Sequence, residues 1–146
     1  MTSTITSLPT SLLARLRLAL TASTQFTTYT NRNGELVVED NSEHWHVVVR
    51  EHRNGRDHAA IVFAPICDAT DASPTRILQL AGQMGAGALA LVGNAYVVRY
   101  AIPAPQIATA PIETILAYVS SLARSVAEDI ASTPRADVST LAHLAM

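Results

Sequence analysis

Histidines near the middle of the chain come closest, in type and spacing, to a chemical site. His44 and His46 are two positions apart, and His52 follows in the same stretch. Residues two apart in a strand point to one face, so the pair could supply two zinc ligands. No Asp or Glu falls on that face within easy reach of both, and Cys67 lies beyond the strand. We therefore expect ordinary strand histidines, with no bound metal and no cofactor.

The other reactive residue types have simple interpretations. Asp68 and Asp71 flank the start of a helix without a paired histidine or nucleophile, which favours capping and turn roles. Cys67 is the single cysteine, so an intramolecular disulfide is impossible. No nucleophile or redox signature surrounds it, and we expect a small buried side chain. Gly85 and Gly87 follow a helix and precede a strand, the reverse of the order in a phosphate-binding loop.

Composition bounds the class of protein. The chain has 146 residues, 49% of them hydrophobic, and a formal net charge of −2. These values predict one folded domain over residues 1–146 and argue against a nucleic-acid-binding surface, which would be basic. No apolar run approaches the ~18 residues of a membrane span. GxSxG, HExxH and Walker patterns are absent from the sequence, so we expect a non-enzymatic protein in the cytoplasm.

Hydrophobic periodicity predicts the elements that position these residues. One helix is expected from Pro9 to about Ala22, a second from Pro74 with Ser73 as its N-cap, and a third from Pro111 to about Ala131. Strands are expected over 25–30, 35–39, 43–52, 57–64, 88–92 and 95–101. The order α-β-β-β-β-α-β-β-α with short turns predicts an α+β fold, in which helices pack on one face of an antiparallel sheet.

Prolines and polar residues set further expectations. Pro65 is expected to end the fourth strand, and residues 67–72 to form a loop. Residues 133–146 are expected to be a C-terminal tail. On the last helix, Ser120 is expected to lie largely opposite the apolar stripe.

Turn residues predict the pairing of two hairpins. With Asn54-Gly55 as the loop, Val48 faces Ile61 and His46 faces Phe63. One face of that hairpin then belongs to the core and carries Trp45, Val47, Val49, Ala60, Val62 and Ala64. The opposite face is mixed and carries His44, His46, Val48, Arg50, His52, Asp57, Ala59, Ile61 and Phe63. In the last hairpin, Gly93-Asn94 pairs Leu91 with Tyr96 and Leu89 with Val98.

A longer stretch resembles the YbjN and type III secretion chaperone-like group. The similar segments are Ile77-Leu78-x-Leu80, Gly87-Ala88-Leu89-Ala90-Leu91 and Tyr96–Pro103, followed by a long amphipathic helix. The element order over residues 8–131 also matches. The resemblance implies a small non-enzymatic cytoplasmic protein, usually dimeric, that binds an extended segment of a partner or acts in regulation. Ala81-Gly82, where members often carry Asn, and the nearly neutral charge favour the YbjN-like side of the group.

These observations lead to two expected surfaces. An apolar patch with a polar rim is typical of partner binding, and strand addition at a sheet edge could contribute. The residues expected there are His46, Val48, Arg50, Ile61 and Phe63. Homodimerisation is expected through the second helix and the last hairpin, at Ala88, Ala90, Val97 and Arg99. Alternatively, another element such as the tail covers the patch, or the histidine-bearing face serves a small-ligand or metal-binding regulator.

Overall fold

The computed structural model describes residues 11–132. Helices and strands within this range follow one another in the predicted order. Their bounds are α1 Leu12–Leu20, β1 Phe26–Thr30, β2 Leu36–Asp40, β3 Trp45–Asn54, β4 Asp57–Asp68, η2 Ala69–Asp71, α2 Pro74–Ala81, β5 Ala88–Val92, β6 Ala95–Pro103, η3 Ala104–Gln106 and α3 Ile112–Ser132. The predicted tail, 133–146, lies outside the described residues. Between residues 11 and 132, every helix is too short or too polar to cross a membrane.

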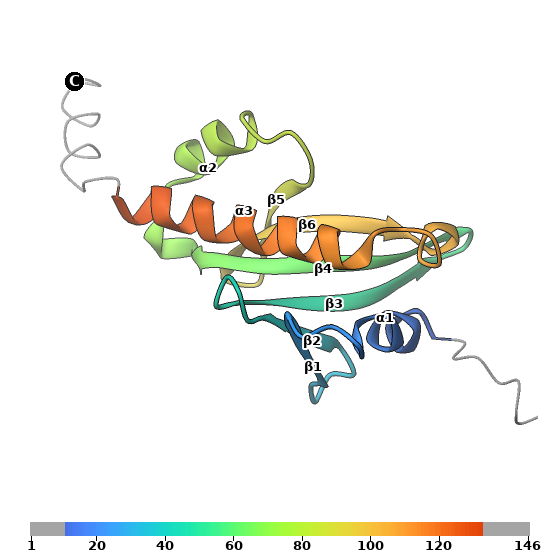
Figure 1. Cartoon of the computed structure of the whole chain (residues 1–146). Coiled ribbons are helices and arrows are strands. Elements are labelled where there is room, and N and C mark those ends of the chain that lie inside the picture. Colours follow the sequence, from blue (N-terminus) through green and yellow to red (C-terminus); the bar gives the residue numbers. More distant parts are fainter. Residues whose placement is uncertain (1–10, 133–146) are drawn as a thin grey trace, which may run out of the picture.

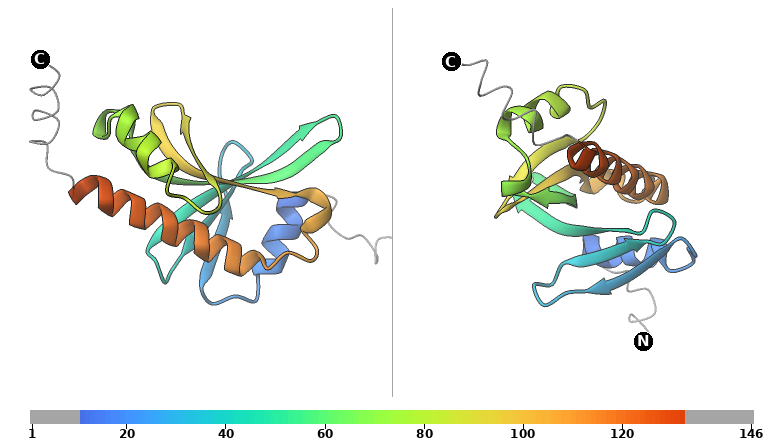
Figure 2. Two further views of the ribbon diagram at one scale, coloured as in Figure 1. Left: turned by 90° about the horizontal axis from the view of Figure 1, so that it is seen from above. Right: turned by 90° about the vertical axis from the view of Figure 1, so that its left-hand side faces the viewer.

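The strands form one six-stranded antiparallel sheet in the order β1-β2-β3-β4-β6-β5. Figures 1 and 2 show α1 and α3 on the same side of this sheet. Helix α3 crosses β2, β3, β4 and β6, whereas α2 lies beside β5 at one end. The predicted α+β fold, with helices packed on one face of an antiparallel sheet, is confirmed.

Alternation along the strands supplies the core. The covered face carries Val47, Val49, Val62 and Val98, each at most 1% exposed. These side chains join Leu12, Leu16, Leu20, Leu116 and Val119 of the helices in one cluster. The predicted core face of the third and fourth strands is therefore confirmed. The expectation that Ser120 lies opposite the apolar stripe is wrong. Ser120 is 1% exposed and lies among the core positions of α3, which buries a broader stripe than expected.

Helix α1 begins at Leu12, later than the predicted start near Pro9. Ser11 is the N-cap, and its hydroxyl accepts the Ala14 backbone N–H at 3.3 Å. The free N–H of Leu12 donates to Glu51 Oε1 on β3, also at 3.3 Å. Exposed donors in the first turn of a helix need such partners. Glu51 therefore attaches α1 to the far end of the β3–β4 hairpin.

Strand β4 continues past Pro65, which was predicted to end it. The register shifts between Pro65 and Cys67, as in a β-bulge, and pairing with β6 goes on to Asp68. Proline has no N–H to donate, so it is tolerated where a ladder bond is not required. Pairing with β3 has already stopped at Phe63. The Pro65 carbonyl accepts the indole N–H of Trp45 at 2.9 Å.

The register of the β3–β4 hairpin differs from the prediction. Asn54 pairs with Asp57, so the turn consists of Gly55 and Arg56 rather than Asn54-Gly55. Gly55 has φ +62° at the first central position, where a type II′ turn requires glycine. Val48 consequently faces Phe63 instead of Ile61. Because the shift along β4 is an even number of residues, the residues that pair between β3 and β4 stay on their predicted faces.

The β5–β6 hairpin keeps its predicted register. Leu91 pairs with Tyr96 and Leu89 with Val98. Gly93 opens the turn with φ +60°, a value that glycine adopts without strain. Strand β5 forms an edge of the sheet, and its outer side pairs with no other strand among the described residues.

Candidate functional site

The sheet face opposite the helices, here called the helix-free face, carries a continuous row of paired residues. The row crosses all six strands through Tyr29, Val37, Val48, Phe63, Arg99 and Ala88. Its first four members are apolar or aromatic, and its fifth is a cation. Neighbouring strands lie about 4.8 Å apart, so adjacent members are in reach of one another. The row links the predicted partner patch to the free edge of β5.

The predicted patch is less exposed than expected. Val48 and Phe63 are half-buried, and Ile61 is only 4% exposed. Part of the cover comes from Arg50, whose Cζ lies 5.2 Å from the centre of the Phe63 ring. Arg50 is also the direct cross-strand partner of Ile61. One alternative expectation was that another element, such as the tail, covers the patch. Among the described residues, part of that cover comes instead from Arg50, a residue of the same face.

A polar network holds Arg50 over Phe63. Its Nε donates to Glu35 Oε2 at 2.6 Å, and Asn31 Nδ2 donates to the other carboxylate oxygen at 3.0 Å. The side-chain oxygen Oδ1 of Asn31 accepts the backbone N–H groups of Asn33 and Glu35. The hydrogen bond from Asn31 is the main cause that lowers the pKa of Glu35. Burial opposes that effect, and Arg50 adds to it. The carboxylate thus stays ionised and keeps the guanidinium in place.

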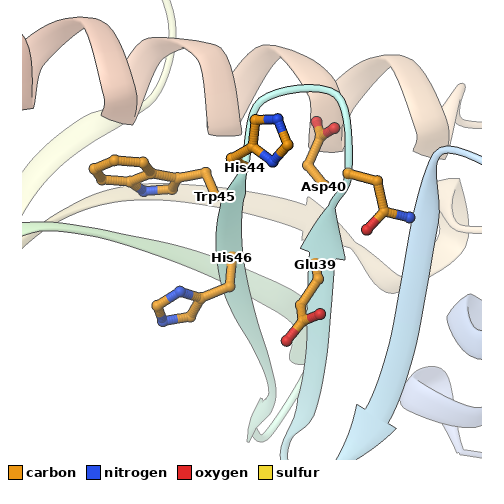
Figure 3. A pocket seen from close by; sticks show the side chains of 6 residues that line it. Glu39, Asp40, His44, Trp45 and His46 are labelled. Atoms are coloured by element: carbon orange, nitrogen blue, oxygen red, sulfur yellow. The ribbon is translucent and has the colours of Figure 1, made fainter.

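The histidines do not gather into one site. His44 has φ +54° and lies in the β2–β3 turn rather than in a strand, so its predicted place on the face of His46 is wrong. Figure 3 shows His46 on the same side of the hairpin as Glu39, its cross-strand partner, with His44 at the turn. His52 lies 3.3 Å from Asp57 at the other end of the sheet.

The hollow in Figure 3 has a volume of about 250 Å³. Its lining is polar and consists of Glu39, Asp40, Asn41, His44, Trp45 and His46. Asp40 is already engaged, because its Oδ1 accepts the backbone N–H groups of Ser42 and Glu43. Within residues 11–132, no group of three or more His, Cys, Asp or Glu side chains is arranged to hold a metal ion.

A second hollow of about 520 Å³ lies between Trp45 and the end of β4. Cys67 lines it and is half-buried. Burial is the main cause that raises the pKa of the Cys67 thiol, and the charges of Asp71 and Asp68 raise it further. A raised pKa keeps the thiol protonated and weakens it as a nucleophile. The surroundings of Cys67 therefore disfavour covalent chemistry.

The residues predicted for dimerisation do share one face of the β5–β6 hairpin, but they differ in exposure. Ala88 and Arg99 are exposed, Ala90 is half-buried, and Val97 is 5% exposed. Val97 therefore has little area to offer another molecule. On this hairpin the largest apolar exposure lies at Leu91, which is 58% exposed on the edge strand. On α2, the helix also expected at the dimer interface, Leu78 is 73% exposed.

Sequence reasoning missed Glu35 and Asn31. Asn31 begins an Asn-Arg-Asn-Gly turn, and a side-chain bond to a nearby backbone N–H is common at such positions. That signal was present in the sequence. The Glu35–Arg50 ion pair depends instead on the β2–β3 register, which no Asn-Gly or Asp-Gly pair within residues 41–44 signals in the sequence.

No protein-family model and no curated protein sequence matches the chain. The resemblance to the YbjN and secretion chaperone-like group stays a prediction.

Proposed function

We propose that this protein is a non-enzymatic, chaperone-like or regulatory module that captures an extended segment of a partner protein on its helix-free face. One observation carries the proposal. Val48 and Phe63 form an apolar pair on a sheet face over which no helix packs among the described residues. Half-buried apolar side chains with a charged rim are typical of protein-binding surfaces. We place the protein in the cytoplasm as part of the same proposal.

The expected contact is shallow and adaptable. A bound segment would cover Val48 and Phe63 and would replace part of the contact between Arg50 and the Phe63 ring. Arg50 has 52% of its side chain exposed, so it can move aside at small cost. Ile61 lies beside this pair on the same face and supports it from the side, since it is already buried. His46, exposed at the rim, adds a polar contact.

The test is binding of a fluorescent 12-residue peptide of alternating valine and threonine, measured by anisotropy with the full chain. Val48→Asp places a charge in the apolar pair and is expected to weaken binding by more than about tenfold. The matched control is Leu18→Asp, since Leu18 is also apolar and 58% exposed but lies on α1. That control is expected to bind as the wild type does.

Thermal unfolding of each variant establishes that it is folded before binding is compared. Equal weakening by Val48→Asp and Leu18→Asp would count against the helix-free face. Failure of the wild type to bind the peptide at millimolar concentration would remove the proposal itself.

Homodimerisation through the β5–β6 hairpin is a second proposal, favoured by the free edge of β5 and the exposed Leu91. Two edge strands that meet would complete each other's backbone hydrogen bonds. Light scattering across a concentration range tests it. A dimer mass that falls to the monomer value in Leu91→Lys is expected. A monomer mass for the wild type at all concentrations would refute it.

A further inference from the structure

Arg99 is a cation with apolar neighbours on every side of its position in the sheet. Its direct partners are Phe63 on β4 and Ala88 on β5, and Val97 and Ala101 flank it along β6. Its guanidinium forms no ion pair or hydrogen bond with any residue in the range 11–132. Arg50, the other arginine beside Phe63, is by contrast neutralised by Glu35. Arg99 thus offers an available positive charge within an apolar surface.

The strand next to Arg99 is an edge strand that carries no lysine, proline or bulge, although it is short and α2 contacts it. Natural edge strands carry lysine, proline or a bulge, which prevent pairing with other chains. Strand β5 reads Ala-Leu-Ala-Leu-Val, and its five residues pair with β6 without a bulge. Leu91 and Val92 are 58% and 36% exposed. The edge is therefore ready to accept another strand by backbone hydrogen bonding.

An added strand would bring one side chain beside Ala88 on the helix-free face. Two strand spacings, roughly 9–10 Å in total, would then separate that side chain from Arg99. Because Ala88 has only a methyl group, nothing on β5 blocks the path between them. A long arginine and a glutamate can meet across such a gap, whereas the shorter aspartate is less suited. On the opposite face of the sheet, an apolar residue of the added strand, three positions from the one beside Ala88, would cover Leu91.

We propose that the free edge of β5 binds an extended partner segment that carries a glutamate opposite Ala88, where Arg99 pairs with it. This inference rests on the proposed function, the capture of an extended segment, and adds a contact for such a segment at the β5 edge, which lies two strands away from Phe63. A second copy of the chain paired at this edge, as in the second proposal above, would compete with such a segment and would leave Arg99 without a carboxylate partner, because residues 88–94 contain none. Nucleic acid also carries negative charge, but the net charge of −2 disfavours it as the occupant.

The test uses three 12-residue peptides of alternating valine and threonine that differ at one central position, which is Glu, Asp or Gln. Anisotropy is measured with the full-length wild type, Arg99→Gln and Arg56→Gln. Arg56 is an exposed arginine in the β3–β4 turn and serves as the matched control. The wild type is expected to bind the Glu peptide about tenfold more tightly than the Gln peptide, with Asp between them.

That preference is expected to vanish in Arg99→Gln, to persist in Arg56→Gln, and to shrink at high salt. If all three peptides bind equally well to the wild type, the glutamate–Arg99 pairing is wrong while capture of an extended segment stands. If none binds, the proposed function fails with it.

Two competition experiments address the other occupants. Where the protein is dimeric, the Glu peptide is expected to convert it to the monomer, and a dimer mass that persists under saturating peptide would overturn the proposal. A 12-nucleotide single strand is expected to compete poorly with the Glu peptide. Tighter binding of that strand than of the peptide, lost in Arg99→Gln, would assign the edge to nucleic acid instead.

Discussion

The two faces of the sheet bury isoleucine in different ways. Ile102, on the covered face, is 2% exposed and belongs to the cluster that contains Leu116 and Val119 of α3. Ile61, on the helix-free face, is 4% exposed but lies outside that cluster. Its cross-strand partner is the long, partly exposed side chain of Arg50. Nearly equal burial thus conceals unequal packing. If either isoleucine is replaced by a smaller residue, an arginine side chain can move into the space more easily than a packed helix can.

The largest effect is expected for Ile102→Ala. The substitution leaves a cavity between β6 and the helices, which can close only in part, and should lower the free energy of unfolding by about 3–4 kcal/mol. Urea unfolding followed by circular dichroism measures this loss. A loss below about 1 kcal/mol would mean that the covered face is not tightly packed.

The matched substitution on the other face, Ile61→Ala, is expected to cost about 2 kcal/mol, at the low end for such a change. Arg50 and the neighbouring strand side chains can move toward the space, and water can reach it. The same urea experiment compares the two variants directly. The contrast between the faces would not hold if Ile61→Ala cost as much as Ile102→Ala.

Arg50→Ala probes the cover of the helix-free face and is expected to destabilise the protein by about 1 kcal/mol. The change removes a partly exposed ion pair with Glu35 and the contact over Phe63, each worth a fraction of that value. Arg56→Ala in the adjacent turn is the control and should be neutral within about 0.5 kcal/mol. Because the substitution uncovers Phe63, the valine–threonine peptide should bind the Arg50→Ala variant more tightly than the wild type. Weaker binding would show that Arg50 is a binding contact rather than a cover.

The smallest effect is the pH dependence contributed by Glu35. Its folded-state pKa is lowered, chiefly by the hydrogen bond from Asn31, so the ionised form stabilises the folded chain. This contribution is fully present above the ordinary glutamate pKa of about 4.3 and is lost as pH falls through the lowered folded value. The stability difference between the wild type and Glu35→Gln should therefore be largest at neutral pH and shrink as the pH falls below the ordinary glutamate pKa. A difference that is independent of pH would exclude an ionised Glu35 as its source.

Local signals predicted most of the architecture. Ser73 and Pro74 begin α2 as expected, and the Ser73 hydroxyl accepts the Arg76 backbone N–H at 3.1 Å. Gly93-Asn94 gives the observed pairing of β5 with β6. Each of these features depends on residues a few positions apart, so the chain specifies it without reference to the rest of the fold.

Prediction failed at two turns, at Gly55-Arg56 and at His44, and where a distant strand decided the outcome. Pro65 was expected to end β4, yet pairing with β6 carries the strand through a bulge to Asp68. His44 was placed on a strand face, but the β2–β3 turn holds it in a left-handed conformation. The candidate site was predicted in composition, since Val48 and Phe63 do lie together. The cover of Phe63 by Arg50 was not predicted, because Glu35, which holds Arg50 in place, is fifteen residues away from it in sequence.

By itself, the sequence determined the order of elements, the strand alternation and the placement of Val48, Ile61 and Phe63 on one sheet face. The hydrophobic residues recur with a period of two in the strands and of about 3.6 in the helices, and the shifted β3–β4 register does not change this pattern. Only the tertiary structure decided that Arg50 shields Phe63 while Arg99 keeps an available charge beside an open edge. Those two outcomes depend on which strands become neighbours, and pairing between distant segments is set by the packing of the whole sheet.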